Sequence, residues 1–191
     1  MKRLLLIFAL CAARLCDAGV TINYEGSAKD SNAIGAILSE ATSFGKGRGW
    51  RVEPVAKDKV ELERVIDEKT SKYTGALRGI ILYPHDMCEP VHIEFGSDMF
   101  MQDFVKTQFA GANIHVAVID LLRHLKSYFA SLKVDDEGEY WETSDKAKLE
   151  KHIATVNRTL DDIKREKPSA RGPVKLKDGR IADVIQRPQN A

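Results

Sequence analysis

The sequence predicts an α+β fold, in which a mainly antiparallel sheet carries amphipathic helices packed on one face. Strand-like alternation of apolar and polar residues occurs at 20–25 and 91–95. A continuous apolar run at 80–83 is typical of an interior strand, and the short loop between it and 91–95 predicts a hairpin. Apolar residues at helical spacing predict amphipathic helices over 114–132 and 149–163.

The first strand, 20–25, is followed by a predicted helix. Asp30 or Ser31 is placed to cap this helix, and apolar residues recur at helical spacing over 34–44. Three alternate glycines that begin at Gly45 predict its end. Because these glycines follow a helix instead of preceding one, their polarity is wrong for a phosphate loop, and we exclude nucleotide binding there.

The next segment predicts a returning strand at 50–53, which we expect Pro54 to end. Residues 56–76 fit either a strand or a polar helix, and we favour a strand with a loop after Asp67. In residues 99–110 the apolar residues follow neither the spacing of a strand nor that of a helix.

The two long helices complete the domain. Asn113 is placed to cap the first, whose apolar stripe runs to Leu132. The second begins near Ser144 and carries its apolar stripe to Ile163. The segment between them is acidic and contains two aromatic residues.

Length, charge and cysteine content exclude several classes of protein. The chain has 191 residues, with 29 Lys and Arg against 28 Asp and Glu. This near-neutral charge excludes a strongly basic nucleic-acid binder, so we expect no nucleic-acid partner. Length predicts a single α+β domain over 19–167. The tail, 168–191, is rich in Pro, Gly and charge, which favours a disordered segment; the alternative is a small hairpin at its Asp178-Gly179 turn pair.

The N-terminal segment, 1–18, has the pattern of a cleavable secretory signal helix. A basic start precedes an apolar run from Leu4 to Ala13, and small residues follow. We expect cleavage after Ala18, with Ala13 as second choice, and export to the periplasm or the extracellular space. The run is too short for a transmembrane span. Removal of this segment changes the net charge from +1 to −1 and leaves Cys88 as the sole cysteine.

The densest group of chemically active residues surrounds the predicted hairpin loop. His85, Cys88, His92 and Glu94 offer nitrogen, sulfur and oxygen donors, a mixture that suits Zn or Cu. His92 and Glu94 project from the same strand face because strand side chains alternate. The simpler interpretation is a buried thiol and a surface histidine, with no cofactor. Cys88 as a nucleophile beside either histidine is a further alternative.

Two other segments are candidate contact surfaces. Tyr140 and Trp141 follow the acidic turn 135–139, which lacks the ligand register of a calcium loop. Met and Phe residues crowd 99–109, and these either pack in the core or bind a lipid-like ligand.

The sequence contains no complete catalytic constellation. We therefore expect an exported small globular binding or interaction protein without catalysis, such as an inhibitor or immunity-type partner of another exported protein. Its partner is a protein or a small ligand. The alternative is a metal-dependent enzyme or metal carrier that uses His85, Cys88, His92 and Glu94; a hydrophobic-ligand carrier is a third hypothesis.

Overall fold

The computed structural model describes residues 19–66 and 68–186. The predicted signal segment, 1–18, lies outside the described residues. The described elements, in chain order, are β1 (Thr21–Ala28), α1 (Ser31–Gly47), β2 (Arg51–Ile66), β3 (Lys69–Tyr83), β4 (Val91–Gly96), β5 (Phe100–Lys106), η1 (Gln108–Ala110), α2 (Ala112–Leu125), η2 (Lys126–Tyr128), β6 (Phe129–Asp136), α3 (Tyr140–Thr143), α4 (Lys146–Glu166), β7 (Ala170–Arg171), β8 (Val174–Lys175), β9 (Ile181–Ala182) and β10 (Ile185–Gln186).

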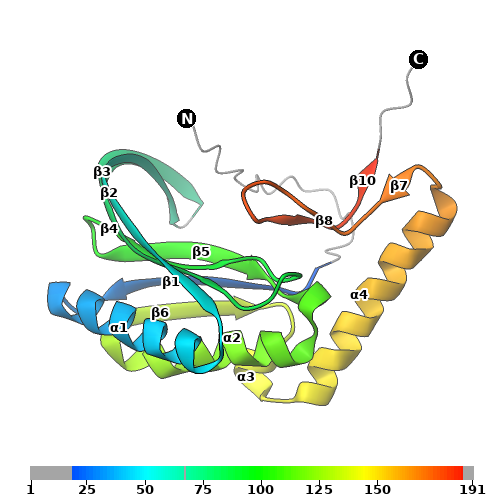
Figure 1. Cartoon of the computed structure of the whole chain (residues 1–191), viewed down its shortest axis with the longest axis horizontal. Coiled ribbons are helices and arrows are strands. Elements are labelled where there is room, and N and C mark those ends of the chain that lie inside the picture. The colour runs from blue at the N-terminus through cyan, green and yellow to red at the C-terminus, as the bar shows by residue number, and fades with distance from the viewer. Residues whose placement is uncertain (1–18, 67, 187–191) are drawn as a thin grey trace.

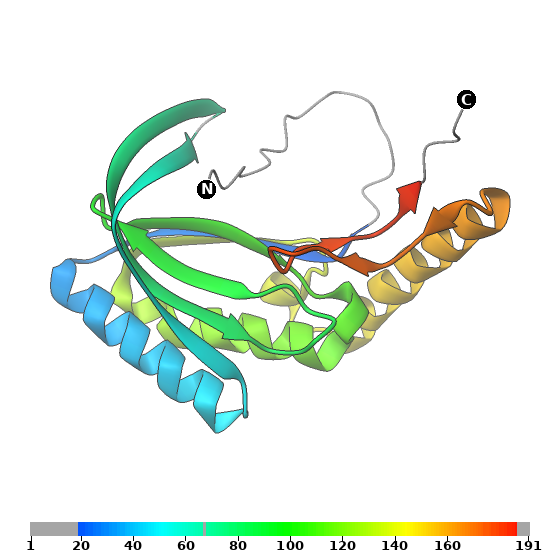
Figure 2. The same ribbon diagram turned by 45° about the horizontal axis from the view of Figure 1, so that its top comes forward.

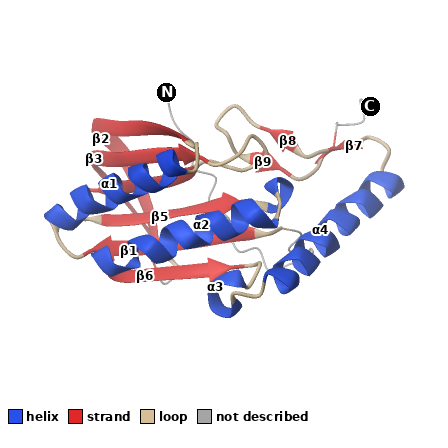
Figure 3. Cartoon of the chain, turned by 60° about the horizontal axis from the view of Figure 1, so that its bottom comes forward, coloured by secondary structure: helices blue, strands red, loops and turns tan. Residues whose placement is uncertain are grey.

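The α+β class is confirmed. One antiparallel sheet has the order β5-β1-β6 and a second has the order β2-β3-β4. Helices α1 and α2 lie together across one side of these strands (Figures 1 and 3). Two further antiparallel pairs, β7–β10 and β8–β9, form in the tail, where the Asp178-Gly179 pair makes the turn of the β8–β9 hairpin.

Local sequence signals account for α1. The Asp30 carboxylate caps it by accepting a hydrogen bond from the Ala33 N–H at 2.8 Å. Gly49 follows its end with φ +72°, a backbone conformation that favours glycine. Gly45 lets the helix approach the sheet, because a Cβ there would lie 2.7 Å from Leu82 Cδ2.

The hairpin of β2 and β3 includes residues 56–76, which fitted either a strand or a polar helix, so the strand interpretation is confirmed. The prediction that Pro54 ends the strand is wrong. β2 is an edge strand that pairs only with β3, so the missing N–H of Pro54 leaves no ladder bond unmade. The outer part of this hairpin, residues 58–66 and 68–74, curls away from α1 and α2 (Figure 2); we call it the arm.

The predicted extent of the helix at 113–132 is also wrong. α2 begins at Ala112 after Gly111, so Asn113 lies inside the helix and does not cap it. α2 ends at Leu125, and Leu132 lies in β6. Residues of β6 pair with β1, and Phe129 and Val134 of β6 are buried in the core, so sheet pairing prevails over helical spacing in this segment. No described helix has both the length and the apolar content needed to cross a membrane.

One large core lies between the helices and both sheets. Its members include Ile37, Leu82, Met101, Val118 and Phe129. Met101 and Val105 of β5 are buried there, so the Met- and Phe-rich segment contributes to the core.

Candidate functional site

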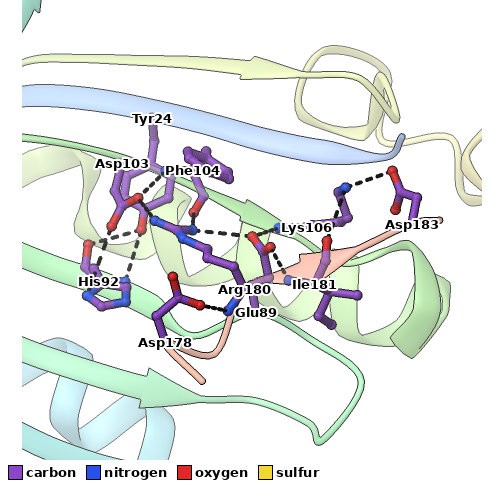
Figure 4. Close-up of polar contacts among 10 residues, drawn as sticks. All are labelled: Tyr24, Glu89, His92, Asp103, Phe104, Lys106, Asp178, Arg180, Ile181 and Asp183. Carbon is purple, nitrogen blue, oxygen red and sulfur yellow. Dashed lines mark hydrogen bonds and ion pairs between the residues drawn. The ribbon is translucent and has the colours of Figure 1, made fainter. Parts of the chain in front are cut away.

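The two sheets meet where β4 lies beside β5, and no backbone ladder joins these strands. Polar side chains bridge them instead. The bridging groups, which we call the seam, are Tyr24, Glu89, His92, Glu94, Asp103 and Arg180. Figure 4 shows most of this arrangement.

Tyr24 satisfies the free edge of β4. Its hydroxyl donates to the His92 carbonyl at 3.0 Å and accepts from the His92 N–H at 3.1 Å, as a neighbouring strand would. Burial raises the pKa of Tyr24 well above its usual value, and the negative charge of Asp103 raises it further. The phenol therefore keeps the proton that it donates.

Glu89 is 2% exposed, and it joins its own loop to β5 and to the tail. One carboxylate oxygen accepts from the Lys106 N–H at 3.0 Å, and the other accepts from the Ile181 N–H at 2.7 Å. Burial of a carboxylate is tolerated only when such donors satisfy it. Glu89 therefore fastens the tail to the edge of β5.

Arg180 fills the centre of the seam from the β8–β9 turn (Figure 4). Its Nη1 donates to Glu89 at 3.2 Å and to the Phe104 carbonyl at 2.6 Å, while Nη2 donates to Asp103. The guanidinium carbon lies 3.9 Å from the centroid of the Phe104 ring. Burial lowers the pKa of Arg180, but Asp103 and Glu89 more than offset this, so the pKa is raised and the charge is permanent.

His92 and Glu94 lie at the side of this group. His92 Nδ1 is 3.4 Å from Glu94 Oε1 and 4.0 Å from Asp103 Oδ2. These distances allow ion pairing when the imidazole is protonated. Glu94 Oε1 is buried and accepts no hydrogen bond from the part of the chain that the structure describes, so this oxygen is an unused acceptor among those residues.

The tail residues 170–186, which we call the strap, make further polar contacts with the body. Lys106 Nζ pairs with the Asp183 carboxylate at 2.9 Å, and Gln108 donates to its other oxygen at 3.2 Å. Lys175 Nζ donates to the Asp86 carbonyl at 2.8 Å.

The structure brings together two of the four residues predicted to bind a metal. His92 and Glu94 are neighbours in the seam. His85 instead accepts the Met87 N–H at 3.0 Å in the exposed loop, and Cys88 is 2% exposed in the core. Among residues 19–66 and 68–186, no three His, Cys, Asp or Glu side chains form a group that can hold a metal ion. The described geometry therefore gives the predicted metal site no support.

Cys88 is also poorly placed as a nucleophile. Burial, together with the charge of Glu89, raises its pKa to about 12. Because the thiolate is the reactive form, a thiol with this pKa is inert near neutral pH. Cys88 is the small buried hydrophobe of the simpler interpretation.

The aromatic pair in α3 has a packing role. Arg123 Nη2 donates to the carbonyls of Tyr140 and Trp141 at 2.9 and 2.8 Å, and its guanidinium lies over both rings. Both side chains are half-buried against the core. The contact surface predicted for Tyr140 and Trp141 stays a prediction.

A second polar group resembles an acid–base relay but is closed to solvent. His115 Nδ1 lies 2.7 Å from Thr107 Oγ1, and its Nε2 lies 3.0 Å from Asp136 Oδ1. The side chains of His115 and Asp136 are both 0% exposed. Burial acts to raise the pKa of Asp136, but His115 and the N–H groups of Trp141 and Gly138 lower it overall. A substrate has no access, so this group stabilises the connection after β6.

Comparison of the chain with protein-family models, with curated proteins and with solved structures finds no match.

Proposed function

We propose that this chain is an exported small binding protein that acts by contact with a partner and without catalysis, as an inhibitor or immunity-type partner of another exported protein. The binding surface that we propose is one face of the β2–β3–β4 sheet.

The alternation along β3 divides its side chains between two faces. Ile80 and Leu82 belong to the main core beneath α1, so Leu77, Ile81 and Tyr83 project to the opposite side. We call that side the distal face. It carries a separate apolar cluster: Val55, Leu62, Leu77 and Ile81 are buried, and Val60, Tyr73 and Tyr83 are partly exposed.

This cluster supports the proposal because none of the described helices lies over it. Figures 1 and 2 show the arm and the strap on the same side of the sheets, opposite α1 and α2. The arm is held in its curve by hydrogen bonds from Arg64 Nη2 to the Phe100 carbonyl (2.8 Å) and between Gln102 and the backbone of Val65 (2.6 and 3.0 Å). The part of this face that a partner can reach consists of Val60, Tyr73 and Tyr83, and partly exposed apolar residues on a rigid framework are typical of a protein-binding site.

A depression of about 340 Å³ extends the distal face toward the strap. It is lined in part by Arg51, Tyr83, His85, Asp86 and Lys175. The Arg51 guanidinium lies 3.6 Å from the centroid of the Tyr83 ring, and the Tyr83 hydroxyl donates to Glu53 at 2.8 Å. Tyrosine and arginine held rigidly in this way are the residue types that dominate binding energy at interfaces.

The experiment pairs Tyr83→Ala with Tyr128→Ala. Both rings are half-buried, but Tyr128 packs against the main core. The chain recovered from the exported fraction of its host is used to isolate a partner. The purified partner is then titrated with each variant in a calorimeter. We expect Tyr83→Ala to raise the dissociation constant at least about tenfold and Tyr128→Ala to change it less than about twofold. A partner bound equally by both variants, or a chain retained inside the cell, would contradict the proposal.

A further inference from the structure

We propose that the seam is an arginine-recognition site, which the strap fills with Arg180 and which a dibasic extended segment of the partner protein occupies by displacing the strap. This inference rests on the proposed function and specifies the chemistry of the partner. It depends on the shape of the site, its surplus of negative charge and the weak attachment of the strap.

The shape of the site selects a guanidinium group. One nitrogen of Arg180 reaches both Glu89 and the Phe104 carbonyl, the other reaches Asp103, and the planar group stacks on the Phe104 ring. A planar fork with several donors meets all these partners at once, whereas an ammonium group is a single point charge. The seam is therefore built for arginine and disfavours lysine.

The charge of the site exceeds what Arg180 neutralises. Three carboxylates, those of Glu89, Glu94 and Asp103, face a single permanent cation. The Glu94 side chain is 16% exposed, and no donor among the described residues forms a hydrogen bond with its buried Oε1. Among the described residues, the other titratable groups that interact with these carboxylates are His92, the phenol of Tyr24 and the thiol of Cys88, and neither the phenol nor the thiol carries a positive charge. A ligand with a second cation near Glu94 would satisfy an acceptor that the strap leaves unused.

The strap is attached mainly by polar contacts. Its strands β7, β8, β9 and β10 have two residues each, and among residues 170–184, whose side-chain burial is described, Ile181 is the one large buried apolar side chain. Segments with few buried apolar contacts open locally at low free-energy cost. Release would free both oxygens of Glu89 from the strap and leave the seam ready for another arginine.

Competition with the tethered strap sets the requirement on the ligand. A short tether gives Arg180 an effective concentration on the order of millimolar. A ligand with one arginine only reproduces the contacts of Arg180, so it does not displace the strap at micromolar concentration. A second arginine that reaches Glu94 supplies the additional interaction, and this is the reason for proposing a dibasic segment.

The first experiment uses the full chain with Arg180→Ala, with Arg171→Ala as the matched control. Arg171 lies in the strap but is exposed. Each variant is heated with methylguanidinium or methylammonium at tens of millimolar. We expect methylguanidinium to raise the melting temperature of Arg180→Ala relative to Arg171→Ala, with no such difference in methylammonium. Equal responses of the two variants, or equal effects of the two cations, would overturn the site.

The second experiment uses the wild-type chain, so it does not depend on how a variant folds. Hydrogen exchange of residues 174–186 is measured with diarginine amide, dilysine amide or neither, and repeated in Glu94→Gln. We expect diarginine to accelerate exchange of the strap about tenfold, dilysine less than twofold, and Glu94→Gln to abolish the difference. Unchanged exchange with diarginine would overturn displacement. If Tyr83→Ala nevertheless binds the purified partner more weakly than Tyr128→Ala does, the proposed function stands while this inference fails.

Discussion

The hydroxyl of Tyr24 provides a sharp test of how the two sheets are joined. Tyr24→Phe removes a single oxygen that is 3.0 Å from the His92 carbonyl and 3.1 Å from its N–H. The ring of Tyr24 is buried, so the change leaves two backbone groups of β4 without a partner. An unsatisfied buried polar group costs about 1–3 kcal/mol, and a phenyl ring is easier to desolvate than a phenol.

We therefore expect Tyr24→Phe to lower the free energy of unfolding by about 2–3 kcal/mol. For a chain of this size, that corresponds to a fall in melting temperature of about 4–12 °C. Urea unfolding, monitored by the fluorescence of Trp50 and Trp141, measures the change. The comparison requires that the free energy of unfolding depends on urea concentration with the same slope in both proteins. Tyr128→Phe is the control, because the Tyr128 hydroxyl makes no hydrogen bond with residues 19–66 or 68–186. A loss below about 0.5 kcal/mol in Tyr24→Phe would refute the argument that this hydroxyl replaces a strand.

Three further outcomes are expected. Intact-mass measurement of the exported chain should place its first residue at Gly19, and a chain that retains Met1 would contradict the signal prediction. Cys88 has a pKa of about 12, so a thiol reagent at pH 8 should label it in urea but not in the folded chain; rapid labelling of the folded chain would contradict its burial. Because the pKa of Asp136 is lowered by folding, its contribution to stability is present above the unfolded value near 3.9 and is lost as the pH falls through the folded value. Asp136→Asn should therefore destabilise the chain at pH 7 and reduce the fall in stability below pH 4, as measured by urea unfolding; an unchanged acid profile would show that Asp136 does not control it.

The elements predicted correctly from sequence are those with local causes. The Asp30 cap, the glycines at the end of α1 and the apolar stripe of α4 each depend on residues within a few positions of one another. The loop between β3 and β4 is equally local. Such signals are read from periodicity and turn chemistry because the interactions that they reflect are short-range.

The errors arise where sheet pairing decides the structure. Helical spacing includes Leu132, but β6 pairs with β1, a strand more than one hundred residues earlier. Pro54 is typical of a strand end, yet an edge strand accommodates it. Neither the pairing partner of a strand nor its position in a sheet is encoded in its own periodicity.

The seam was only partly predicted. The alternation of His92 and Glu94 placed both on one strand face, and the structure brings them together. Arg180, however, is 91 residues from Glu89 and 77 from Asp103. The available signal was the Asp178-Gly179 turn, which predicts a hairpin but not the segment against which that hairpin packs.

A double-mutant cycle between Arg180 and Asp103 tests the central claim, that Arg180 holds the strap in the seam. The free energy of unfolding in urea is measured for Arg180→Ala, Asp103→Ala and the double variant. A control cycle uses Arg171→Ala in place of Arg180→Ala. Because both partners are less than one quarter exposed, we predict a coupling free energy above about 1 kcal/mol for Arg180 and within about 0.3 kcal/mol of zero for Arg171. Coupling near zero between Arg180 and Asp103 would contradict the account.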